Sequence, residues 1–539
     1  MSDDSLQDAP VARPQRRHVP RTVLISVVIW LIAMIGFRLA PNMGQAIINI
    51  ATMALTMLLA IVLMLYFLFM SSFSRRTRGV VALSSVFLAI AFTVTVKVVS
   101  FSGDIIPVFV WRWSAAPDTL LDQITDIPIT ELVDLSVTSN IDFPRFLGPD
   151  GSAAIENVRW LSDTPAEAVT LKWRSEIGAG WSGFVARNGY AITMQQRGPD
   201  EVVSCHKIET GELVWASSTQ TRHETVLGGI GPRSTPTIDK GRVYSVGAHG
   251  MVRCIDGGNG NQIWQADLLE MIGSTPAKDI QAIAWGRSNS PLVDGDRVIV
   301  PIGGPPGGPF FSLIALDAVS GEPLWKAGDR QVSYSSPRIT EFAGQRQIVS
   351  VNENQVSGHE IETGEQLWAF DFEGSSNTGA SVSQAVPIGD DMLLVSKEYG
   401  VGSAVMKITE NDGSWQVDEV WADSTVMKTK FTNVTLHEGY VYGLSDGILE
   451  CIEAKSGTRQ WKKKRFGQGQ LLRLADRLLV LAENGQLWFV TATPSGYQPL
   501  GSVDVLNDKC WATLCLYDNL LLVRSETEVA CYELPIERN

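Results

Sequence analysis

Three long apolar stretches dominate the first hundred residues of the chain. They comprise Thr22–Ala40, Ala46–Phe73 and Val80–Phe101. Because roughly 20 apolar residues cross the hydrocarbon of a bilayer, each stretch is long enough to span it. The pattern predicts a membrane domain at 22–101 with three transmembrane helices, at about 22–40, 46–70 and 80–101. Arg38 and Lys97 lie near the ends of their stretches and are expected to snorkel to the headgroups.

A cleaved signal peptide is the alternative for the first stretch. No A-x-A-like cleavage site follows it, however, and the next apolar stretch begins within six residues. The sequence therefore favours a retained membrane helix.

Basic residues are unevenly distributed around these stretches, which predicts their orientation. They lie before the first stretch and between the second and third, whereas the loop from Pro41 to Gln45 has none; they are Arg13, Arg16, Arg17, Arg21, Arg75, Arg76 and Arg78. Because cytoplasmic loops are enriched in Lys and Arg, we expect a cytoplasmic N-terminal tail at 1–21 and an extracytoplasmic chain after Phe101. Trp111 and Trp113 fit either the aromatic belt at a membrane surface or the core of a folded domain.

The pattern changes after residue 141 to short apolar segments separated by polar turns with glycine. A tryptophan closes each unit, as in Glu209–Trp215 and Gly257–Trp264. Complete units end at Trp215, Trp264, Trp325, Trp368 and Trp461; degenerate ones end at Trp421 and Leu500. A repeat of roughly 40 residues is typical of a β-propeller blade.

The eighth unit is divided between the two ends of this region. Glu528–Leu534 has the apolar strand but no turn and tryptophan after it, whereas Leu171–Trp173 has the tryptophan strand with nothing before it. Joining them closes a ring and removes two exposed sheet edges. With a further hairpin between successive tryptophan strands, the pattern predicts an all-β, eight-bladed propeller at 142–539, after a linker at 102–141.

The repeat tryptophans are predicted to be structural and to pack between neighbouring blades. They are Trp173, Trp215, Trp264, Trp325, Trp368, Trp421 and Trp461. Three cysteines, Cys205, Cys254 and Cys451, each lie six residues before a turn glycine, and Cys531 fits the same position in the divided unit. Equivalent positions in different blades are too far apart for a disulfide, so these cysteines are expected to fill a small core position.

Charge and residue spacing argue against nucleic-acid binding and against a histidine metal site. With 58 acidic and 44 basic residues, the net charge of −14 argues against nucleic acid as a partner. The six histidines show no metal-ligand spacing, and His206 and His359 occupy equivalent repeat positions, which favours packing roles. Whether Cys510 and Cys515 pair or remain free stays open.

The tryptophan units resemble the PQQ-type (pyrrolo-quinoline quinone) repeats of the quinoprotein alcohol dehydrogenase-like superfamily. More closely, residues 142–539 are similar to bacterial PQQ-binding-like propeller proteins of the BamB type. The similarity rests on Phe143–Gly151, Gly229–Pro236, Ser333–Pro337 and Lys509–Trp511, with Leu147 departing from the usual opening motif. Together with the three apolar stretches and the arginine distribution, this resemblance to bacterial proteins predicts a multi-pass protein of the inner (cytoplasmic) membrane with a periplasmic propeller.

The resemblance leaves two functions open, and the sequence favours one without catalysis. A membrane-bound PQQ-dependent dehydrogenase that oxidises alcohols or sugars is the alternative; such enzymes use vicinal cysteines and Ca²⁺, but this chain has no adjacent cysteines and no suitable Asp/Asn cluster. Nucleophile-elbow, HExxH and Walker motifs are also missing from the sequence. We therefore expect no catalytic residue, no metal and no cofactor, with PQQ and Ca²⁺ only under the alternative.

Polar and aromatic residues on loops that enter the innermost strands are expected to converge on the mouth of the propeller funnel. They are Trp181, Arg233, Trp285, Arg287, Tyr334, Asn377, Lys428 and Lys430. Their cations favour a small anionic or carboxylate-bearing ligand; the competing interpretation is that they satisfy backbone carbonyls. Outer strand edges offer β-augmentation by a partner peptide. The sequence thus predicts a membrane-anchored scaffold or ligand-binding module with protein partners in the cell envelope.

Overall fold

The computed structural model describes residues 21–40, 43–124 and 132–538. They form two compact units, one of N-terminal helices and one that includes everything from Thr95 onward. Each unit is described by itself. Most of the expected cytoplasmic tail, residues 1–20, lies outside the described residues.

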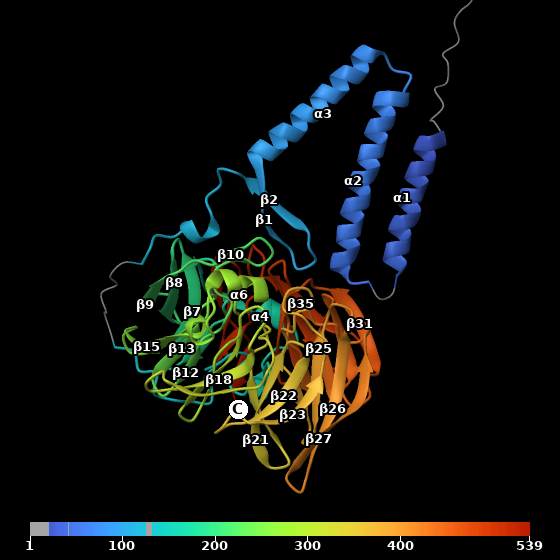
Figure 1. Ribbon diagram of the computed structural model, residues 1–539. Coiled ribbons are helices and arrows are strands. Elements are labelled where there is room, and N and C mark those ends of the chain that lie inside the picture. The colour runs from blue at the N-terminus through green and yellow to red at the C-terminus, as the bar shows by residue number, and fades with distance from the viewer. Residues whose placement is uncertain (1–20, 41–42, 125–131, 539) are drawn as a thin grey trace, which may run out of the picture. The chain divides into compact units, whose positions relative to one another are not determined.

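The N-terminal unit consists of three apolar helices, α1 (Arg21–Leu39), α2 (Gln45–Met70) and α3 (Arg75–Thr95) (Figure 1). Their mean hydropathies are 2.3, 2.6 and 1.8, and each is long and apolar enough to cross a membrane. None of the three most apolar windows is buried inside the protein. Helices that expose apolar side chains along their length are typical of membrane spans, and their presence agrees with the sequence.

The third helix differs from its predicted bounds of 80–101. It begins at Arg75 and ends at Thr95, and residues Val96–Phe101 form strand β1 instead. These residues are rich in valine, which favours extended backbone, and they pair antiparallel with β2 (Pro107–Trp111). Hydropathy alone could not separate a strand of this composition from the end of a helix.

The segment expected to be a linker, 102–141, is partly structured. It contains the turn of the β1–β2 hairpin, strand β2 and a short 3-10 helix, η1 (Pro117–Thr119). Further along, Val133 and Leu135 are buried in a core cluster with Val185 and Trp215.

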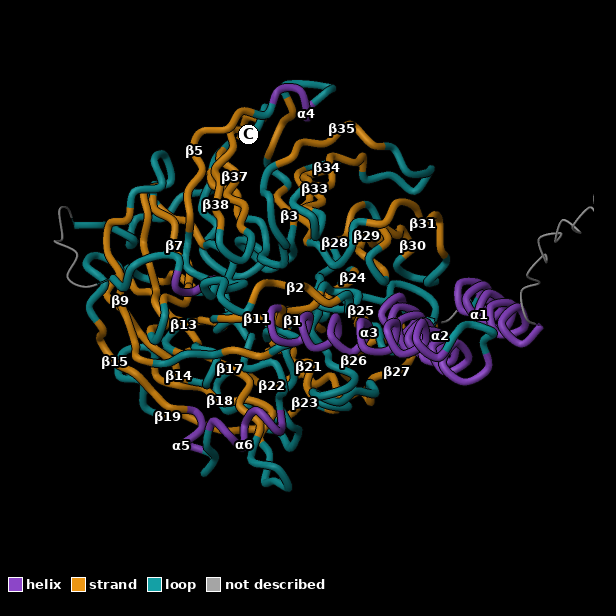
Figure 2. Tube along the Cα trace, turned by 90° about the horizontal axis from the view of Figure 1, so that it is seen from above, coloured by secondary structure: helices purple, strands orange, loops and turns teal. Residues whose placement is uncertain are grey.

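Eight sheets of the described chain form the blades of a propeller, and Figure 2 shows them in a ring. The first blade consists of β6 (Val185–Arg187), β7 (Tyr190–Arg197), β8 (Asp200–Lys207) and β9 (Leu213–Gln220), and the second of β12 (Thr237–Asp239), β13 (Arg242–Val246), β14 (Met251–Asp256) and β15 (Gln262–Asp267). The third consists of β16 (Leu292–Asp294), β17 (Arg297–Gly303), β18 (Phe311–Asp317) and β19 (Pro323–Ala327). The fourth consists of β20 (Arg338–Phe342), β21 (Gln345–Asn352), β22 (Gln355–Glu360) and β23 (Gln366–Asp371).

The next three blades continue the same order. They are β24 (Val386–Ile388), β25 (Met392–Lys397), β26 (Gly402–Asn411) and β27 (Ser414–Asp423); β28 (Thr435–His437), β29 (Tyr440–Ser445), β30 (Ile448–Glu453) and β31 (Arg459–Arg465); β32 (Gln470–Leu474), β33 (Arg477–Leu481), β34 (Gln486–Thr491) and β35 (Pro499–Asp504), with β3 (Ala154–Ile155) added parallel to β32. Smaller elements lie between blades or beside them: β10 (Glu224–Thr225), β11 (Gly229–Ile230), α4 (Pro165–Ala168), α5 (Leu268–Met271) and α6 (Pro276–Ala282).

The last blade closes the ring, as the divided repeat predicted. Strands β36 (Cys515–Tyr517), β37 (Leu520–Arg524) and β38 (Glu528–Glu533) are completed by β5 (Thr170–Glu176). Strand β38 pairs antiparallel with β5, so that Cys531 lies opposite Trp173. A second pairing between the two ends of the propeller joins β39 (Ile536–Arg538) to β4 (Val158–Trp160). The predicted eight-bladed propeller is confirmed.

Each cysteine of the repeat lies opposite a repeat tryptophan on the neighbouring strand. Cys205 pairs with Trp215, Cys254 with Trp264 and Cys451 with Trp461. In the β20–β23 blade the same position is Gly358, where an added Cβ would lie 2.2 Å from the Trp368 ring. The position is small because the indole covers it. All six cysteines are buried, and Cys510 and Cys515 are free thiols.

Candidate ligand site in the propeller funnel

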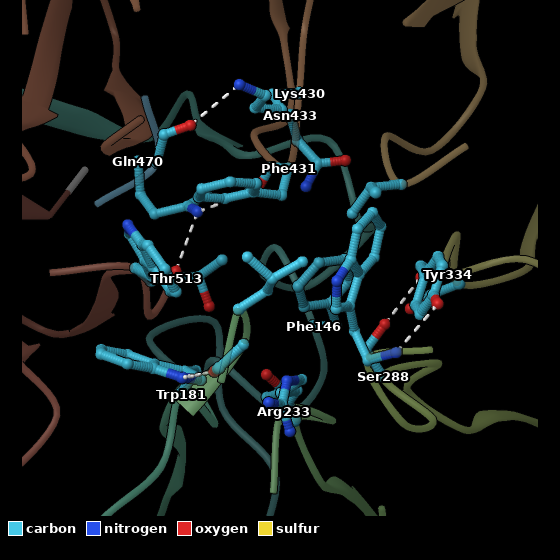
Figure 3. A pocket seen from close by; sticks show the side chains of 18 of the residues that line it. Phe146, Trp181, Arg233, Ser288, Tyr334, Lys430, Phe431, Asn433, Gln470 and Thr513 are labelled. Atoms are coloured by element: carbon cyan, nitrogen blue, oxygen red, sulfur yellow. Dashed lines mark hydrogen bonds between the residues drawn. The ribbon is translucent and has the colours of Figure 1, made fainter. Parts of the chain in front are cut away.

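The loops that enter the inner strands of several blades enclose a cavity of about 190 Å³ in the funnel (Figure 3). Its lining is mostly apolar and includes seven aromatic residues: Phe146, Trp181, Trp285, Tyr334, Tyr399, Phe431 and Trp511. Small-molecule and side-chain sites are typically apolar cavities with a few polar groups that orient the ligand. The polar groups here decide what the cavity can hold.

Five of the eight predicted site residues line this cavity. They are Trp181, Arg233, Trp285, Tyr334 and Lys430. They come from loops before different blades, so the ring brings together residues up to 249 positions apart between Trp181 and Lys430. That these residues bind a ligand stays a prediction.

Arg287 and Asn377 lie outside the cavity lining and have structural contacts. The Arg287 guanidinium is 1% exposed and donates to both carboxylate oxygens of Asp279, at 2.8 and 3.0 Å. The Asn377 side chain accepts from the backbone N–H of Ala284 and donates to the carbonyl of Gln281. Both residues therefore fix loops at the mouth, Arg287 through a carboxylate and Asn377 through main-chain groups.

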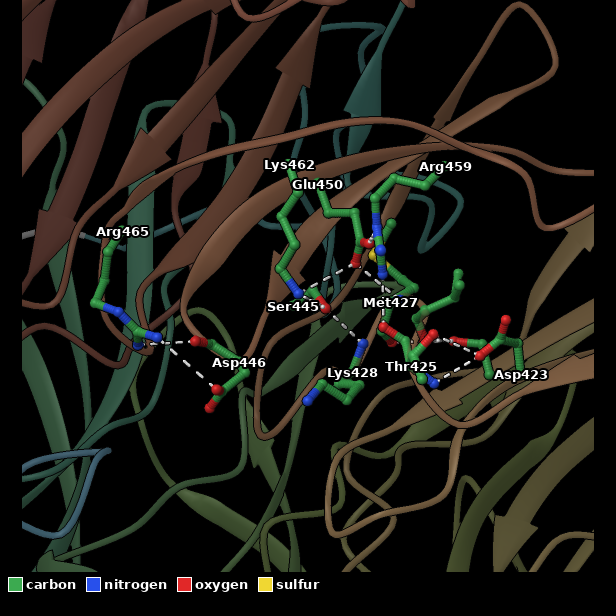
Figure 4. A network of polar contacts seen from close by, with 12 residues as sticks. Asp423, Thr425, Met427, Lys428, Ser445, Asp446, Glu450, Arg459, Lys462 and Arg465 are labelled. Carbon is green, nitrogen blue, oxygen red and sulfur yellow. Dashed lines mark hydrogen bonds and ion pairs between the residues drawn. The ribbon is translucent and has the colours of Figure 1, made fainter. Parts of the chain in front are cut away.

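Lys428 also lies outside the cavity lining, in a polar network on the β28–β31 blade (Figure 4). Its backbone N–H donates to the hydroxyl of Ser445 at 2.9 Å, and Lys462 donates to the same hydroxyl at 2.8 Å. Lys462 also lies 3.7 Å from the fully buried carboxylate of Glu450. This network connects adjacent loops of one blade and does not face the cavity.

Lys430 lines the cavity, but propeller and hairpin groups already engage its charge. Its Nζ lies 3.5 Å from Oε2 of Glu398 and donates to the carbonyl of Gly103 at 2.8 Å. Burial raises the pKa of Glu398, and the charge of Lys430 opposes that rise. The ion pair leaves little net charge for a ligand at this side.

Arg233 is the cation that remains for a ligand. Its guanidinium donates to the carbonyls of Gly231 at 2.8 Å and Gly229 at 3.2 Å, and no carboxylate of the described residues forms an ion pair with it. Burial lowers the pKa of Arg233 to about 10, so the group remains charged at neutral pH. The charge of Glu526 acts on Arg233 without forming an ion pair, so the guanidinium can still hydrogen-bond to an anion in the cavity.

Sequence reasoning missed Lys509 as part of this site. Its Nζ lies 4.1 Å from the ring centroid of Trp511 and 5.0 Å from that of Trp181, which places the ammonium over both aromatic faces. Burial lowers the pKa of Lys509, and nearby Glu526 opposes that effect. The signal was its place two residues before Trp511, which lies four residues before β36 as Trp181 lies four residues before β6.

The funnel does not fit the Ca²⁺ that accompanies PQQ in dehydrogenases. Within the described ranges no group of three or more His, Cys, Asp or Glu side chains could hold a metal ion. Ca²⁺ takes six or more oxygen ligands, typically with carboxylates among them, and no Asp or Glu in the described part of the chain lines the cavity.

Comparisons with known proteins agree with this fold. The sequence profile of the family described as "Outer membrane protein assembly factor BamB" matches residues 199–492, more than half of the chain. BamB of Burkholderia pseudomallei (strain K96243) is 24% identical over 226 residues, which cover 41% of this chain and 52% of that protein. BamB of Yersinia pestis is 22% identical over 281 residues, covering 50% and 67%. The chain thus spans about half the length of the first relative and two thirds of the second.

Among solved structures, the quinohemoprotein alcohol dehydrogenase of Comamonas testosteroni superposes with a TM-score of 0.54. It is 11% identical, and the match covers 73% of this chain and 80% of that enzyme. At such identity the likeness concerns the fold and not the activity. The profile match over more than half of the residues, by contrast, shows that this chain belongs to the family of outer membrane protein assembly factor BamB.

Proposed function

We propose that this protein is a membrane-anchored scaffold of the bacterial cell envelope that binds partner proteins through the mouth of its propeller. Membership of the BamB family supports a role in protein interaction rather than catalysis. We further propose that α1–α3 hold the protein in the inner membrane, with the N-terminus cytoplasmic and the propeller periplasmic. The distribution of arginines around the helices supports this orientation. The role needs no cofactor.

One observation carries the assignment of the mouth: an apolar cavity rich in aromatic residues contains the charge of Arg233, which forms no ion pair with a carboxylate of the described residues. An apolar side chain of a partner fits the aromatic lining, and a neighbouring carboxylate fits the guanidinium. A small molecule with an apolar body and an anionic group makes the same two contacts and is the second candidate ligand.

Photo-crosslinking in native membranes tests this function. A photoreactive residue replaces Leu227, which lines the cavity and is exposed, and in a matched control it replaces Val319, exposed on the turn between β18 and β19. We expect reproducible protein adducts at position 227 and not at 319. Arg233→Gln should reduce the yield by about tenfold, the effect of losing one charge-assisted hydrogen bond. Lys240→Gln, on an exposed turn, should not.

Two results would argue against the scaffold. Equal adducts at both positions would show that the mouth is not the interacting surface. Absence of protein adducts, together with a co-purified small acid that Arg233→Gln releases, would assign the cavity to a small ligand instead.

A further inference from the structure

The β1–β2 hairpin belongs to none of the eight blades. It forms a two-stranded sheet of its own, and its tip at 102–105 reaches the mouth of the funnel. Ser102, Gly103 and Ile105 complete the lining of the cavity beside Lys430 and Phe431. The funnel is therefore already occupied on one side by a turn from the same chain.

Propeller side chains form hydrogen bonds with main-chain carbonyl and N–H groups of this turn. Lys430 Nζ donates to the carbonyl of Gly103 at 2.8 Å, and the N–H of Gly103 donates to Oε1 of Glu483 at 2.6 Å. Lys509 Nζ donates to the carbonyl of Phe101 at 3.2 Å. Contacts to main-chain groups depend on backbone shape and little on the side chains of the turn.

The side chain of Asp104 provides the chemical selectivity. It is buried, its Oδ2 lies 3.1 Å from a guanidinium nitrogen of Arg465, and its Oδ1 accepts from the amide of Gln468 at 3.1 Å. Charge-assisted hydrogen bonds are stronger than neutral ones, and they distinguish a carboxylate from an amide of the same shape.

The receiving side chains are held in place by the propeller itself. Glu483 also accepts from the indole N–H of Trp511 at 3.1 Å and from the backbone N–H of Gln468 at 3.0 Å. Arg465 donates to the carbonyl of Asp446 at 2.8 Å, and Lys430 is paired with Glu398. The site therefore keeps its geometry when the turn leaves, as a preorganised binding site requires.

Apart from the polar contacts of its tip, the hairpin has no further strand paired with it in the described structure. A two-stranded sheet alone is marginally stable in water. Ile105 has a φ of 59°, a left-handed conformation that a β-branched residue avoids, and Ile106 and Phe109 remain exposed.

We propose that the mouth of the propeller is a docking site for an acidic β-turn, and that the hairpin tip occupies it as an internal ligand that a partner polypeptide displaces. The partner presents a carboxylate beside a tight turn, with an apolar residue following it into the aromatic cavity. This inference rests on the proposed scaffold role and names the kind of partner segment.

Substitutions in the hairpin tip can empty the docking site without changing the propeller residues that bind the tip. A Cβ at position 103 would lie 2.2 Å from Cγ of Gln468, so Gly103→Val prevents the tip from seating. Asp104→Asn is the milder second variant, because it removes only the charge read by Arg465. The full chain is purified in lipid nanodiscs, and an unchanged thermal transition shows that the blades remain intact.

The probe is a disulfide-closed fluorescent hairpin peptide with a Ser-Gly-Asp-Ile turn, and the control peptide has Asn in place of Asp. By fluorescence anisotropy, we expect Gly103→Val to bind the Asp peptide at least about tenfold more tightly than the unaltered chain does, and about tenfold more tightly than it binds the Asn peptide. Adding Arg465→Gln to Gly103→Val should abolish the preference for Asp.

The inference is wrong if both vacated variants bind the two peptides equally, or if the unaltered chain binds the Asp peptide as tightly as they do. The outcome is independent of the crosslinking experiment. Peptide selectivity without protein adducts would retain the turn site and overturn the scaffold role, whereas adducts without selectivity would do the reverse.

Discussion

At the residue scale, most interfaces between blades are built around a tryptophan and a turn, although Leu500 replaces the tryptophan in one blade and Trp368 donates to Gln347 of its own blade. The indole N–H of Trp173, Trp215 and Trp264 donates to a carbonyl in the next blade's turn, three residues before the turn glycine. Trp421 and Trp461 continue the pattern with Ala454 and Thr493. The glycine lies against the ring, so that a Cβ at Gly321 would be 2.7 Å from Trp264. The repeat thus encodes contacts between blades as well as strands within them.

Trp325 departs from this pattern, since its buried indole N–H has no hydrogen-bond partner in the described structure. Trp264→Phe removes a bond of 3.1 Å to the carbonyl of Ala318 and is expected to cost about 1 kcal/mol beyond the loss of buried area. Trp325→Phe removes only an unsatisfied donor and should cost about 1 kcal/mol less than Trp264→Phe. Urea unfolding of the two variants measures the difference, and equal losses would contradict the assignment.

Two buried histidines should make the propeller less stable in acid. In His206 and His359 one ring nitrogen contacts a serine hydroxyl and the other a turn-glycine carbonyl. Burial lowers the pKa of His206 to about 4 and also lowers that of His359. The unfolded chain takes up protons near pH 6.5 and the folded chain only at lower pH, so the stabilisation is complete above about pH 6.5 and declines toward pH 4.

Thermal melting between pH 7 and 4.5 measures this decline. His206→Gln with His359→Gln should flatten the dependence of Tm on pH compared with the unaltered protein. If both proteins lose Tm in parallel, other groups set the acid stability, such as carboxylates or His223, whose pKa is also lowered by burial.

At the element scale, the pairing of β38 with β5 holds the ring closed. Deletion of 528–539 removes β38 and exposes the edges of β5 and β37, which should abolish the cooperative thermal transition and cause aggregation. Deletion of 536–539 removes only β39 from its pairing with β4 and should lower Tm while the transition stays cooperative. Calorimetry with size-exclusion chromatography separates the two outcomes. Similar behaviour of both truncations would show that the pairing of β38 with β5 is not what keeps the ring closed.

At the scale of the whole molecule, the arginine distribution predicts the orientation of the chain in the membrane. Alkaline phosphatase, which is active only after export, should be inactive when fused after residue 74, before Arg75, Arg76 and Arg78. The same enzyme fused after residue 539 should be active. Activity at residue 74 and none at the C-terminus would reverse the proposed topology.

The sequence alone determined the three apolar helices, the eight blades and the partner of Trp173, because these depend on local periodicity and on a repeat that is counted directly. It also identified Trp181, Arg233 and Tyr334 as lining residues, since equivalent loop positions converge on one axis. Only the tertiary structure decided which of the predicted cations form ion pairs with carboxylates of the propeller. Arg287 meets Asp279 eight residues away, but Lys430 meets Glu398 and Gly103 through the ring, and no sequence spacing shows such pairs.

The hairpin shows the same division between local pattern and tertiary contact. Val96–Phe101 is apolar enough to extend a membrane helix, and only its pairing with Pro107–Trp111 makes it a strand. The contact of Asp104 with Arg465, 361 residues away, then places its turn in the funnel. Hydropathy measures preference for a solvent, whereas the choice of a partner segment depends on geometry that exists only after the ring has closed.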